Sequence, residues 1–384
     1  MKIIIGADIK VSEENKDKFE SGKWESLVGE KLASILKEAD FRIFNLETAV
    51  GSKGGKIKKA GPHLLMSEAA FAGVNALNPT VLSISNNHVM DYGYEGLRET
   101  IRIIKDNNIL YVGAGENIHD AKCGLILEQN GIRVAIYSCA EHEFSIASDK
   151  TAGCNPYDPL YSFDDVKALK AKSDYVIVLY HGNKELYRYP SPNVQRVCRK
   201  FAESGADVVV CQHSHCIGAS EKYQGAELVY GQGNFIMYSS TNEFYQTGLL
   251  IQIELLRSPE LESSVRYIPI HRDGTVISLA EESQGLEILQ QFEERSNQIK
   301  SDDFVASNYQ VFAKMHIREY LACCLGGVRN NFWFKVFNKL SKGKLIDSCY
   351  KDSKTLIGLL NTIECEAHRE LFMAALKDKI NGEE

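Results

Sequence analysis

Residues 81–93 read VLSISNNHVMDYG, an apolar run that stops abruptly at amide and imidazole side chains. The first five residues, VLSIS, form a short and mostly apolar run, which is typical of a strand. Asn86, Asn87 and His88 follow at once, and Asp91 comes three residues later. A strand that ends in such polar side chains predicts an α/β sheet with a functional site at its carboxyl edge.

Four further apolar runs end at side chains that can bind a metal. KIIIGA ends at Asp8, FRIF at Asn45-Leu46-Glu47, YVIVLY at His181, and DVVVCQ at His213-Ser214-His215. Each residue alone is more often a turn former, a helix cap or a surface residue than a ligand. Their joint occurrence counts for more, because the carboxyl ends of the strands meet at one edge of an α/β sheet. In an extended segment, His213 and His215 also point the same way.

These side chains form a mixed set of donor groups. Carboxylate, imidazole and amide oxygen together suit Mn, Fe or Zn better than Ca or Mg, which prefer oxygen ligands alone. The sequence therefore predicts a transition-metal site that is built from six side chains: Asp8, Glu47, Asn87, His181, His213 and His215.

The remaining runs predict two sheets. Up to residue 113, strand-like runs alternate with helical spacing, which favours a parallel sheet. The predicted strands are 2–7, 41–47, 80–86 and 109–113, and the predicted helices are 24–39, 67–77 and 94–107. Asn130-Gly131 then joins two strands as a hairpin with a type I′ turn. Strands at 175–180 and 208–212, a helix at 194–204, and antiparallel strands at 228–230, 249–255 and 265–271 complete a mixed α/β sandwich.

The last quarter of the chain has a helical pattern. Leu356, Leu359, Leu360 and Ile363 recur at helical spacing. We therefore predict an α/β domain at residues 1–278 and a C-terminal helical region at 279–384. Residues 331–344 combine aromatic and basic side chains. We expect them to dock on the neighbouring domain, with a membrane-surface helix, a lid and a dimer contact as alternatives.

Composition limits the class of protein. The 384 residues are 44% hydrophobic and 25% charged, which is ordinary for a globular protein. A net charge of −7 disfavours nucleic acid as a partner. No run approaches the roughly 18 apolar residues of a membrane span, and the start of the chain is too soon charged for a secretory signal. The 10 cysteines show no repeated C-x-x-C spacing, which predicts reduced thiols in a cytoplasmic protein.

The order of the motifs resembles the capsule-synthesis CapA family, a branch of the calcineurin-like metallophosphoesterase superfamily. The resemblance lies in Asp8, N-L-E at 45–47, K-A-G-P at 59–62, S-N-N-H-x-x-D-x-G at 85–93, His181 with Glu185, G-A-D at 205–207, H-S-H at 213–215 and G-N-F at 233–235. It covers roughly residues 1–256 and is specific as a set. It implies a two-sheet metallophosphoesterase-like sandwich flanked by helices, which the C-terminal helices extend.

Carried over by position, the resemblance implies one or two divalent transition metals, which are Mn, Fe or Zn. It makes Glu47 the bridge between two metal sites. The other ligands divide into two sets, Asp8 with His215, and Asn87 with His181 and His213. It makes His88 the catalytic histidine that faces the substrate, and Asp91 the carboxylate that orients it.

Two positions depart from the pattern of the wider superfamily. Superfamily phosphatases commonly carry D-x-H on the first strand, whereas the third residue here is Lys10, whose ammonium cannot ligate a metal. The site that contains Asp8 therefore loses a ligand. Glu47 lies in N-L-E instead of a G-D motif, and Asn45 is either a further ligand or a neighbour of the ligands.

The chemistry that this implies is metal-dependent hydrolysis. A divalent metal lowers the pKa of bound water from 15.7 toward about 7, so the expected nucleophile is a metal-activated hydroxide. We predict a phosphoesterase for an anionic small molecule or polymer, with substrate contacts from Lys59, His63, Asn45 and Glu185. The alternatives are the processing of poly-γ-glutamate capsule polymer and a non-catalytic, metal-dependent binding protein. A homodimer is left open.

Overall fold

The computed structural model describes residues 1–238 and 242–382. The chain divides into two compact units, Met1–Ala306 and Ser307–Glu384. The sequence predicted a boundary after residue 278, but helix α8 (Glu282–Gln298) belongs to the first unit. The reason is packing, since the ring of Phe292 in α8 contacts the ring of Tyr267 with 4.8 Å between their centroids.

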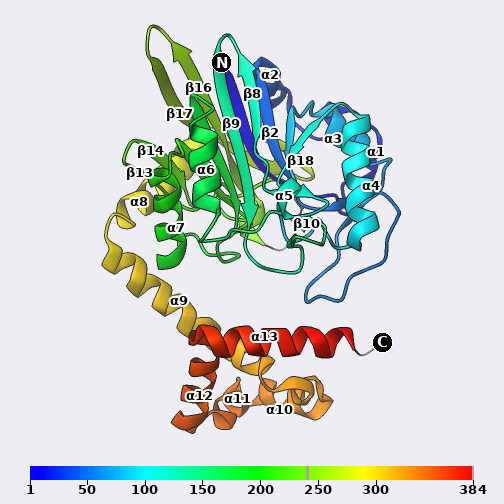
Figure 1. Cartoon of the computed structure of the whole chain (residues 1–384), viewed down its shortest axis with the longest axis vertical. Helices are drawn as coiled ribbons and strands as arrows, with labels where there is room; N and C mark the ends of the chain where they lie inside the picture. The colour runs from blue at the N-terminus through cyan, green and yellow to red at the C-terminus, as the bar shows by residue number, and fades with distance from the viewer. Residues whose placement is uncertain (239–241, 383–384) are drawn as a thin grey trace. The chain divides into compact units, whose positions relative to one another are not determined.

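All strands belong to the first unit among the described residues (Figure 1). They are β1 (Lys2–Ile9), β2 (Phe41–Leu46), β3 (Ala49–Val50), β4 (Leu65–Met66), β5 (Val81–Ser83), β6 (Leu110–Val112), β7 (Ala114–Gly115), β8 (Leu125–Gln129), β9 (Ile132–Ala140), β10 (Gly153–Cys154), β11 (Tyr175–His181), β12 (Val208–Gln212), β13 (Ser220–Tyr223), β14 (Ala226–Val229), β15 (Asn234–Ile236), β16 (Thr247–Arg257), β17 (Leu261–Asp273) and β18 (Val276–Leu279).

The helices of the first unit, besides α8, are α1 (Lys16–Glu20), η1 (Trp24–Ser26), α2 (Glu30–Glu38), α3 (Phe71–Ala76), α4 (Gly93–Asp106), α5 (Ile118–Ala121), α6 (Ser162–Lys170), α7 (Pro192–Glu203) and η2 (Glu243–Tyr245). Helix α9 (Asp302–Cys323) crosses the boundary between the units. The helices that follow are η3 (Gly326–Asn330), α10 (Phe332–Leu340), α11 (Lys344–Cys349), α12 (Ser353–Glu364) and α13 (Glu366–Asn381).

The strands form two main sheets. The first is 8-stranded, in the order β18-β17-β16-β1-β2-β5-β6, and β15 pairs with β1 off this path. In it, β1, β2, β5 and β6 run parallel, and β16, β17 and β18 are antiparallel. The second is 6-stranded, in the order β13-β14-β12-β11-β9-β8, with a parallel centre and antiparallel edges. The prediction of a mixed two-sheet α/β fold is confirmed.

The sheets pack face to face, because alternate residues of a strand turn to opposite sides. Ile3 and Ile5 of β1 share one core with Ile177 and Val210 of the second sheet. Ile4 lies between them in the sequence and joins a different core, on the side of the first sheet that faces helices. Strands that are buried on both faces must be apolar throughout, which explains the continuous apolar runs in the sequence.

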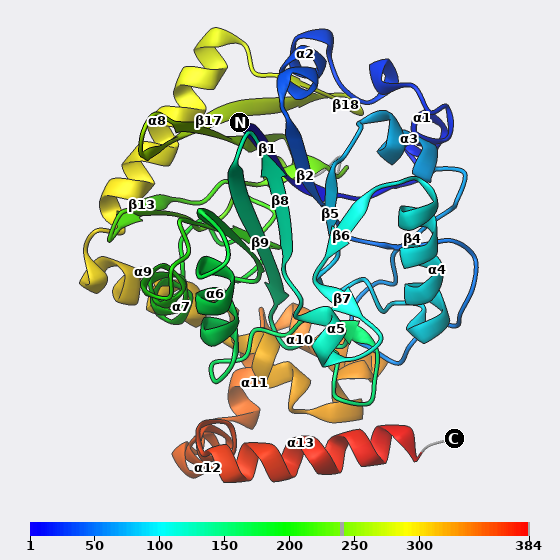
Figure 2. The same ribbon diagram turned by 45° about the horizontal axis from the view of Figure 1, so that its top comes forward.

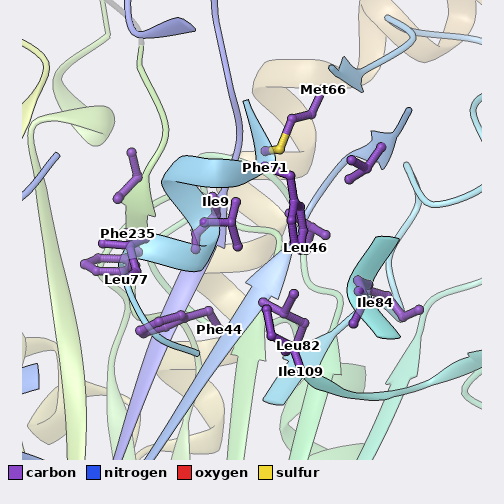
Figure 3. Packing of buried hydrophobic residues seen from close by; sticks show 14 of the residues in the cluster. Ile9, Phe44, Leu46, Met66, Phe71, Leu77, Leu82, Ile84, Ile109 and Phe235 are labelled. Carbon is purple, nitrogen blue, oxygen red and sulfur yellow. The ribbon is translucent and has the colours of Figure 1, made fainter. Parts of the chain in front are cut away.

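Helices cover the outer faces of both sheets. In the core outside the first sheet, the rings of Phe44 and Phe235 lie 4.9 Å apart, close to residues of α3 (Figure 3). Phe201 of α7 and Val166 of α6 belong to a third core, outside the second sheet. Figure 2 shows α4 on the opposite side of the first unit from α6 and α7. The first unit is therefore a sandwich with two sheets inside and helices outside.

Two local predictions agree with the structure only in part. The helix expected over 24–39 is split into η1 and α2, because Val28 forms a parallel bridge with Ile277 and Gly29 donates its N–H to Ile277 O. The strand expected to be antiparallel at 228–230 is β14, which runs parallel to β12. It is antiparallel to its other neighbour, β13. Because β13 runs opposite to β12, the next strand, β14, has the direction of β12 again.

The C-terminal unit is helical, as the sequence predicted, but it has almost no core of its own. Among its described residues, Ile346 is the only buried side chain. Many large apolar residues of α10, α12 and α13 are exposed instead. None of the helices over the described residues combines the length and the apolar character that a membrane span requires.

Candidate metal centre and active site

The six predicted ligands come together at one edge of the two sheets. Asp8 lies near the end of β1, Glu47 directly follows β2, Asn87 follows β5, His181 ends β11, and His213 and His215 follow β12. The parallel register places Asp8 beside Asn45 of β2 and Asn234 of β15. The site therefore lies at the carboxyl ends of parallel strands, which is the usual place for a ligand in α/β sheets.

The first set of possible ligands, here called the His213 group, consists of Glu47, His181 and His213. All three side chains are buried, and their donor atoms lie within 4.8 Å of one another. His181 Nε2 is 3.5 Å from Glu47 Oε1 and 3.1 Å from His213 Nδ1. The side-chain oxygen of Asn87 is also 3.1 Å from His181 Nε2, so an amide oxygen adjoins this group.

The second set, here called the Asp8 group, consists of Asp8, Glu47 and His215, with donor atoms again within 4.8 Å. His215 Nε2 is 3.9 Å from Glu47 Oε1. His215 Nδ1 lies 3.3 Å from Asp8 Oδ2, but its nearer acceptor is Asn234 Oδ1 at 2.9 Å. Because Glu47 belongs to both groups, it lies between them.

Two carboxylate oxygens of these groups have no hydrogen-bond donor within the described part of the chain. They are Asp8 Oδ2 and Glu47 Oε2, and both are buried. A buried carboxylate oxygen without a partner is costly, so native proteins pair it with a donor or a cation. Carboxylate and imidazole together suit a divalent transition metal. The residues that are present therefore fit a metal centre.

The charges of the two groups shift the pKa values of their members. Burial alone would raise the pKa of Asp8, but contact with His215 and the charge of His181 lower it below its usual value. Burial alone would lower the pKa of His215, but the carboxylates of Glu47 and Asp8 raise it to about 9. For His213, burial and the charges of His181 and His215 act together and hold the pKa well below the usual value.

The backbone at the two histidines differs from the prediction. His213 and His215 have φ values of 81° and 55°, in the left-handed region. They are not alternate residues of an extended segment, so that argument for their shared direction was wrong. Their ring centroids still lie 6.0 Å apart, because the chain turns as it leaves β12. Such backbone conformations cost roughly 1–3 kcal/mol each and persist where the surroundings fix them, often at functional sites.

A second charged cluster, here called the His88 cluster, consists of His88, Asp91 and Lys59. His88 Nδ1 is 2.7 Å from Asp91 Oδ2. Lys59 Nζ donates to Asp91 Oδ1 and lies 3.2 Å from His88 Nδ1. The N–H of Leu64 also donates to Asp91 Oδ2, at 2.7 Å. Asp91 therefore engages Nδ1 of His88, which leaves Nε2 as the nitrogen for proton exchange.

The carboxyl group of Asp91 stays ionised in this setting. Burial alone would raise the pKa of Asp91, but the hydrogen bonds from His88, Lys59 and Leu64 lower it. The side chain of Lys59, which the sequence assigned to substrate binding, is 2% exposed and already paired with Asp91. Asp91 was considered above as a residue that orients His88, and the hydrogen bond has the geometry for that role.

A cavity of about 710 Å³ opens over the ligands. Its walls include Glu47, Asn87, His88 and His215 from the clusters described above. Lys59 of the His88 cluster also lines it, and the other lining residues are Lys10, Ala60, Gly61, Pro62, Leu64, His142, Glu143, Phe144, Glu185, Met237 and Tyr245. Three of the six predicted ligands thus line the same cavity as His88 and Lys59. Glu185, predicted as a substrate contact, is half exposed there, 3.9 Å from His213 Nε2.

Two predicted substrate contacts lie elsewhere. Asn45 is 0% exposed. Its amide donates to Asp8 Oδ1 at 2.7 Å and lies 3.3 Å from His181 Nδ1, so it supports ligands beneath the cavity. His63 contacts Ile57 O through Nε2 at 2.7 Å and is absent from the described lining. The sequence placed it in the right loop, but within that loop its ring is bound to Ile57 O.

The sequence assigned no role to two residues that the structure places at the site. Asn234 accepts from His215 Nδ1 and donates to His215 O at 3.1 Å, so it fixes the ring of a ligand. The G-N-F motif was the available signal for it. The ring of Tyr245 lies 5.4 Å from that of His215, and burial together with the charge of Glu47 raises its pKa. No local pattern marks Tyr245, because it comes from η2, which is distant in the chain.

Comparison with known proteins agrees with this picture. Residues 2–239 match the family model described as "Bacterial capsule synthesis protein PGA_cap". The "Capsule biosynthesis protein CapA" of Bacillus anthracis is 31% identical over 214 residues, which are 53% of this chain and 52% of that protein. The "PGA biosynthesis protein CapA" of Bacillus subtilis (strain 168) is 28% identical over 241 residues, 62% of this chain and 63% of that protein. The chain thus spans about half to two thirds of the length of these relatives.

Solved structures show weaker likeness. An NAD nucleotidase of Haemophilus influenzae has a TM-score of 0.43 at 14% identity, over 82% of this chain and 67% of that chain. A phosphatase of Mycoplasma pneumoniae has a TM-score of 0.41 at 13% identity, over 70% of this chain and 93% of that chain. Scores this low say nothing about chemistry, whereas the family match covers well over half of the chain. This chain belongs to the bacterial capsule synthesis protein PGA_cap family.

Proposed function

We propose that this protein is a metal-dependent hydrolase that cleaves phosphoesters. The observation that carries the proposal is the buried cluster of Asp8, Glu47 and three histidines, in which Asp8 Oδ2 and Glu47 Oε2 accept no hydrogen bond from the described residues. They lie beneath a cavity that the His88 cluster also reaches. Ligand groups for a cation and a positioned proton donor thus share one space, as metal-assisted hydrolysis requires.

The ligand groups would hold one or two divalent transition metals, with Glu47 shared between them. When bound, such a metal lowers the pKa of a coordinated water toward about 7 and offsets negative charge on a phosphoryl oxygen. The Asp8 group has three protein ligands, and Lys10 lines the cavity as a cation instead of a fourth ligand.

The residues of the cavity wall supply the remaining functions. His88 gives a proton to the leaving oxygen through Nε2, because Asp91 engages Nδ1. Lys59 offsets the charge of Asp91, and Lys10 offers a positive charge to an anionic substrate. Tyr245 covers His215 with its ring and narrows the access of water.

The test is a turnover assay of purified protein that has been stripped with a chelator and reloaded with Mn. The substrates are a panel of phosphomonoesters, phosphodiesters and γ-glutamyl peptides. We expect phosphoester cleavage that the chelator abolishes and Mn restores. His88→Ala should lower kcat by roughly 10²–10⁴-fold with metal still bound. His63→Ala is the matched control, since that ring is bound to Ile57 O, and its kcat should be unchanged.

A second candidate is the processing of poly-γ-glutamate, which the names of the relatives favour. The Bacillus subtilis relative is named a PGA biosynthesis protein. A cavity of about 710 Å³ with Lys10 on its wall has room and a positive charge for a segment of an anionic polymer. Cleavage of γ-glutamyl peptides without any cleavage of phosphoesters would replace the first proposal by this one.

A binding protein without catalysis is the third candidate, because Lys10 takes the place of a ligand. Metal analysis and turnover together separate it from an enzyme. About two equivalents of metal per chain are expected for the two-metal hydrolase. Bound metal with no turnover on any substrate, and equal substrate affinity in the native protein and in His88→Ala, would favour the binding protein.

A further inference from the structure

Helix α10 presents four large apolar side chains to solvent. Phe332, Trp333, Phe337 and Leu340 are 69%, 63%, 56% and 74% exposed. Trp333, Phe337 and Leu340 are spaced i, i+4 and i+7, so they form one stripe along the helix. The rings of Trp333 and Phe337 lie 6.2 Å apart, which makes the stripe continuous. We call these four residues the α10 surface.

The helix under this surface is well formed. The side chain of Asn331 caps it by accepting from the N–H groups of Trp333 and Phe334. Its apolar residues are not needed for a local core, because Ile346 is the only buried side chain among the described residues of the C-terminal unit. An exposed aromatic stripe of this kind marks a surface that meets a partner.

The charge around the α10 surface says which partner fits. Between residues 320 and 346 the sequence has no aspartate or glutamate, although the whole chain has a net charge of −7. The same stretch carries five basic residues: Arg329, Lys335, Lys339, Lys342 and Lys344. In the described part of this unit, Arg318 forms an ion pair with Asp347. No ion pair to a carboxylate is formed there by Lys335, Lys339 or Lys342.

We propose that the α10 surface binds the face of an anionic lipid membrane, with the helix lying in the plane of the interface. Tryptophan and phenylalanine favour the boundary between headgroups and acyl chains, and lysine side chains reach from there to lipid phosphates. The helix has 9 residues and a span needs roughly 20, so it lies on the membrane and does not cross it. A basic and aromatic surface is matched by anionic lipid, which joins negative charge to an apolar layer. A second copy also exposes apolar residues on α12 and α13, but the four acidic residues of these helices are balanced by four basic ones, so they offer no net negative charge.

The first test is sedimentation of the full chain with vesicles of phosphatidylcholine, with or without about 30 mol% phosphatidylserine. We expect binding to the anionic vesicles alone, and its loss at high salt, because ions screen charge beyond about 3 Å at 1 M. Lys335→Gln with Lys339→Gln should weaken binding by about 25-fold, since each lysine near an anionic surface contributes roughly fivefold. Lys377→Gln with Lys379→Gln, on α13, is the matched control and should bind as the native chain does.

The second test follows insertion directly. The sequence has two tryptophans, so Trp24→Phe leaves Trp333 as the only indole. We expect its fluorescence to shift to the blue when anionic vesicles are added, as an indole does on leaving water. Phe337→Ser with Leu340→Ser should abolish the shift and the sedimentation. Leu371→Ser with Phe372→Ser, which are similarly exposed on α13, should leave both unchanged.

Several results would overturn the proposal. They are failure of the native chain to bind anionic vesicles at low salt, equal loss of binding in the α13 controls, or a native dimer that Trp333→Ser converts to a monomer. The last would assign the surface to a second copy of the chain. Because the α10 variants leave the metal centre untouched, their hydrolytic activity should stay at the native level, so this test is independent of the proposed function.

Discussion

Two charged clusters meet in one cavity, and they differ in how well their carboxylates are satisfied. In the two ligand groups, Asp8 Oδ2 and Glu47 Oε2 are buried without a hydrogen-bond donor from the described residues. In the His88 cluster, Asp91 accepts from His88, Lys59 and the N–H of Leu64. The first cluster is incomplete without a cation, whereas the second is complete by itself. Removing a carboxylate should therefore change metal binding in one case and proton transfer in the other.

The largest effect should follow from Glu47→Gln, which removes the shared ligand. We expect bound metal to fall well below the native content, and turnover to be lost. Metal content after gel filtration and the phosphoester assay measure the two outcomes. Glu185→Gln is the control, because this half-exposed carboxylate lines the same cavity and should keep the metal. Full metal content in Glu47→Gln would contradict the conclusion that the ligand groups need a cation and the His88 cluster does not.

The next effect should come from Asp91→Asn. Its amide cannot replace the carboxylate that engages His88 Nδ1, so kcat should fall by roughly 10²–10⁴-fold. Metal content should stay native, because Asp91 touches none of the ligands. The control is Asp106→Asn, at the exposed end of α4, where the carboxylate pairs with Arg102. If Asp91→Asn lost its metal, the two clusters would have to be treated as one.

The complete pairing of Asp91 also predicts a dependence of stability on pH. Its folded pKa is lowered, so its stabilising contribution is present above the unfolded value near 4 and is lost as pH falls through the folded value. Breaking a buried pair costs about 3 kcal/mol. Urea unfolding of the metal-free chain should thus show native protein and Asp91→Asn far apart at pH 7 and closer at low pH. A difference that does not depend on pH would contradict the assignment.

A smaller effect is expected for Asn234→Ala, which removes the side chain that holds the ring of His215. Loss of a partner behind a ligand typically lowers metal affinity by roughly 10–100-fold. The loss should be confined to the Asp8 group, so one equivalent of metal should weaken and the other should not. Competition with a graded chelator resolves the two affinities. Equal weakening of both metals would mean that the groups bind them jointly.

The smallest effect concerns the loop beside His181. Asn183 has a φ of 91° and is 2% exposed, and its amide donates to Tyr189 O at 3.1 Å. Asparagine tolerates the left-handed region better than alanine does. Asn183→Ala should therefore lower the free energy of unfolding by about 1–2 kcal/mol. Asn183→Gly should recover part of it by relieving strain, and thermal unfolding measures both. Identical losses would assign the whole effect to the hydrogen bond.

The sequence could predict those site residues that lie at the ends of strands. Asp8, Glu47, Asn87, His181 and His213 each terminate an apolar run, and parallel strands must bring their ends to one edge. The fold was predictable for the same reason, because alternation of strands and helices fixes the parallel sheets. The split of residues 24–39 was not, since it depends on a bridge from Val28 to Ile277, far along the chain.

Side-chain direction was the part that local sequence could not give. Asn45 and His63 have the residue types of substrate contacts, yet one lies under the ligands and the other faces Ile57 O. Lys59 was expected to meet the substrate and is instead paired with Asp91. Each outcome depends on which partner lies nearest in space, and that partner is distant in the chain.

The sequence by itself determined the sandwich of two sheets, the family, and the residue types of the metal centre. It could do so because apolar periodicity and the residues at strand ends are written locally in the chain. Only the tertiary structure decided which carboxylate oxygens lack a partner, how the chain turns at His213 and His215, and that Asn234 and Tyr245 join the site. Those properties depend on distances between segments that are remote in sequence, and hydrogen bonds and charges act through such distances.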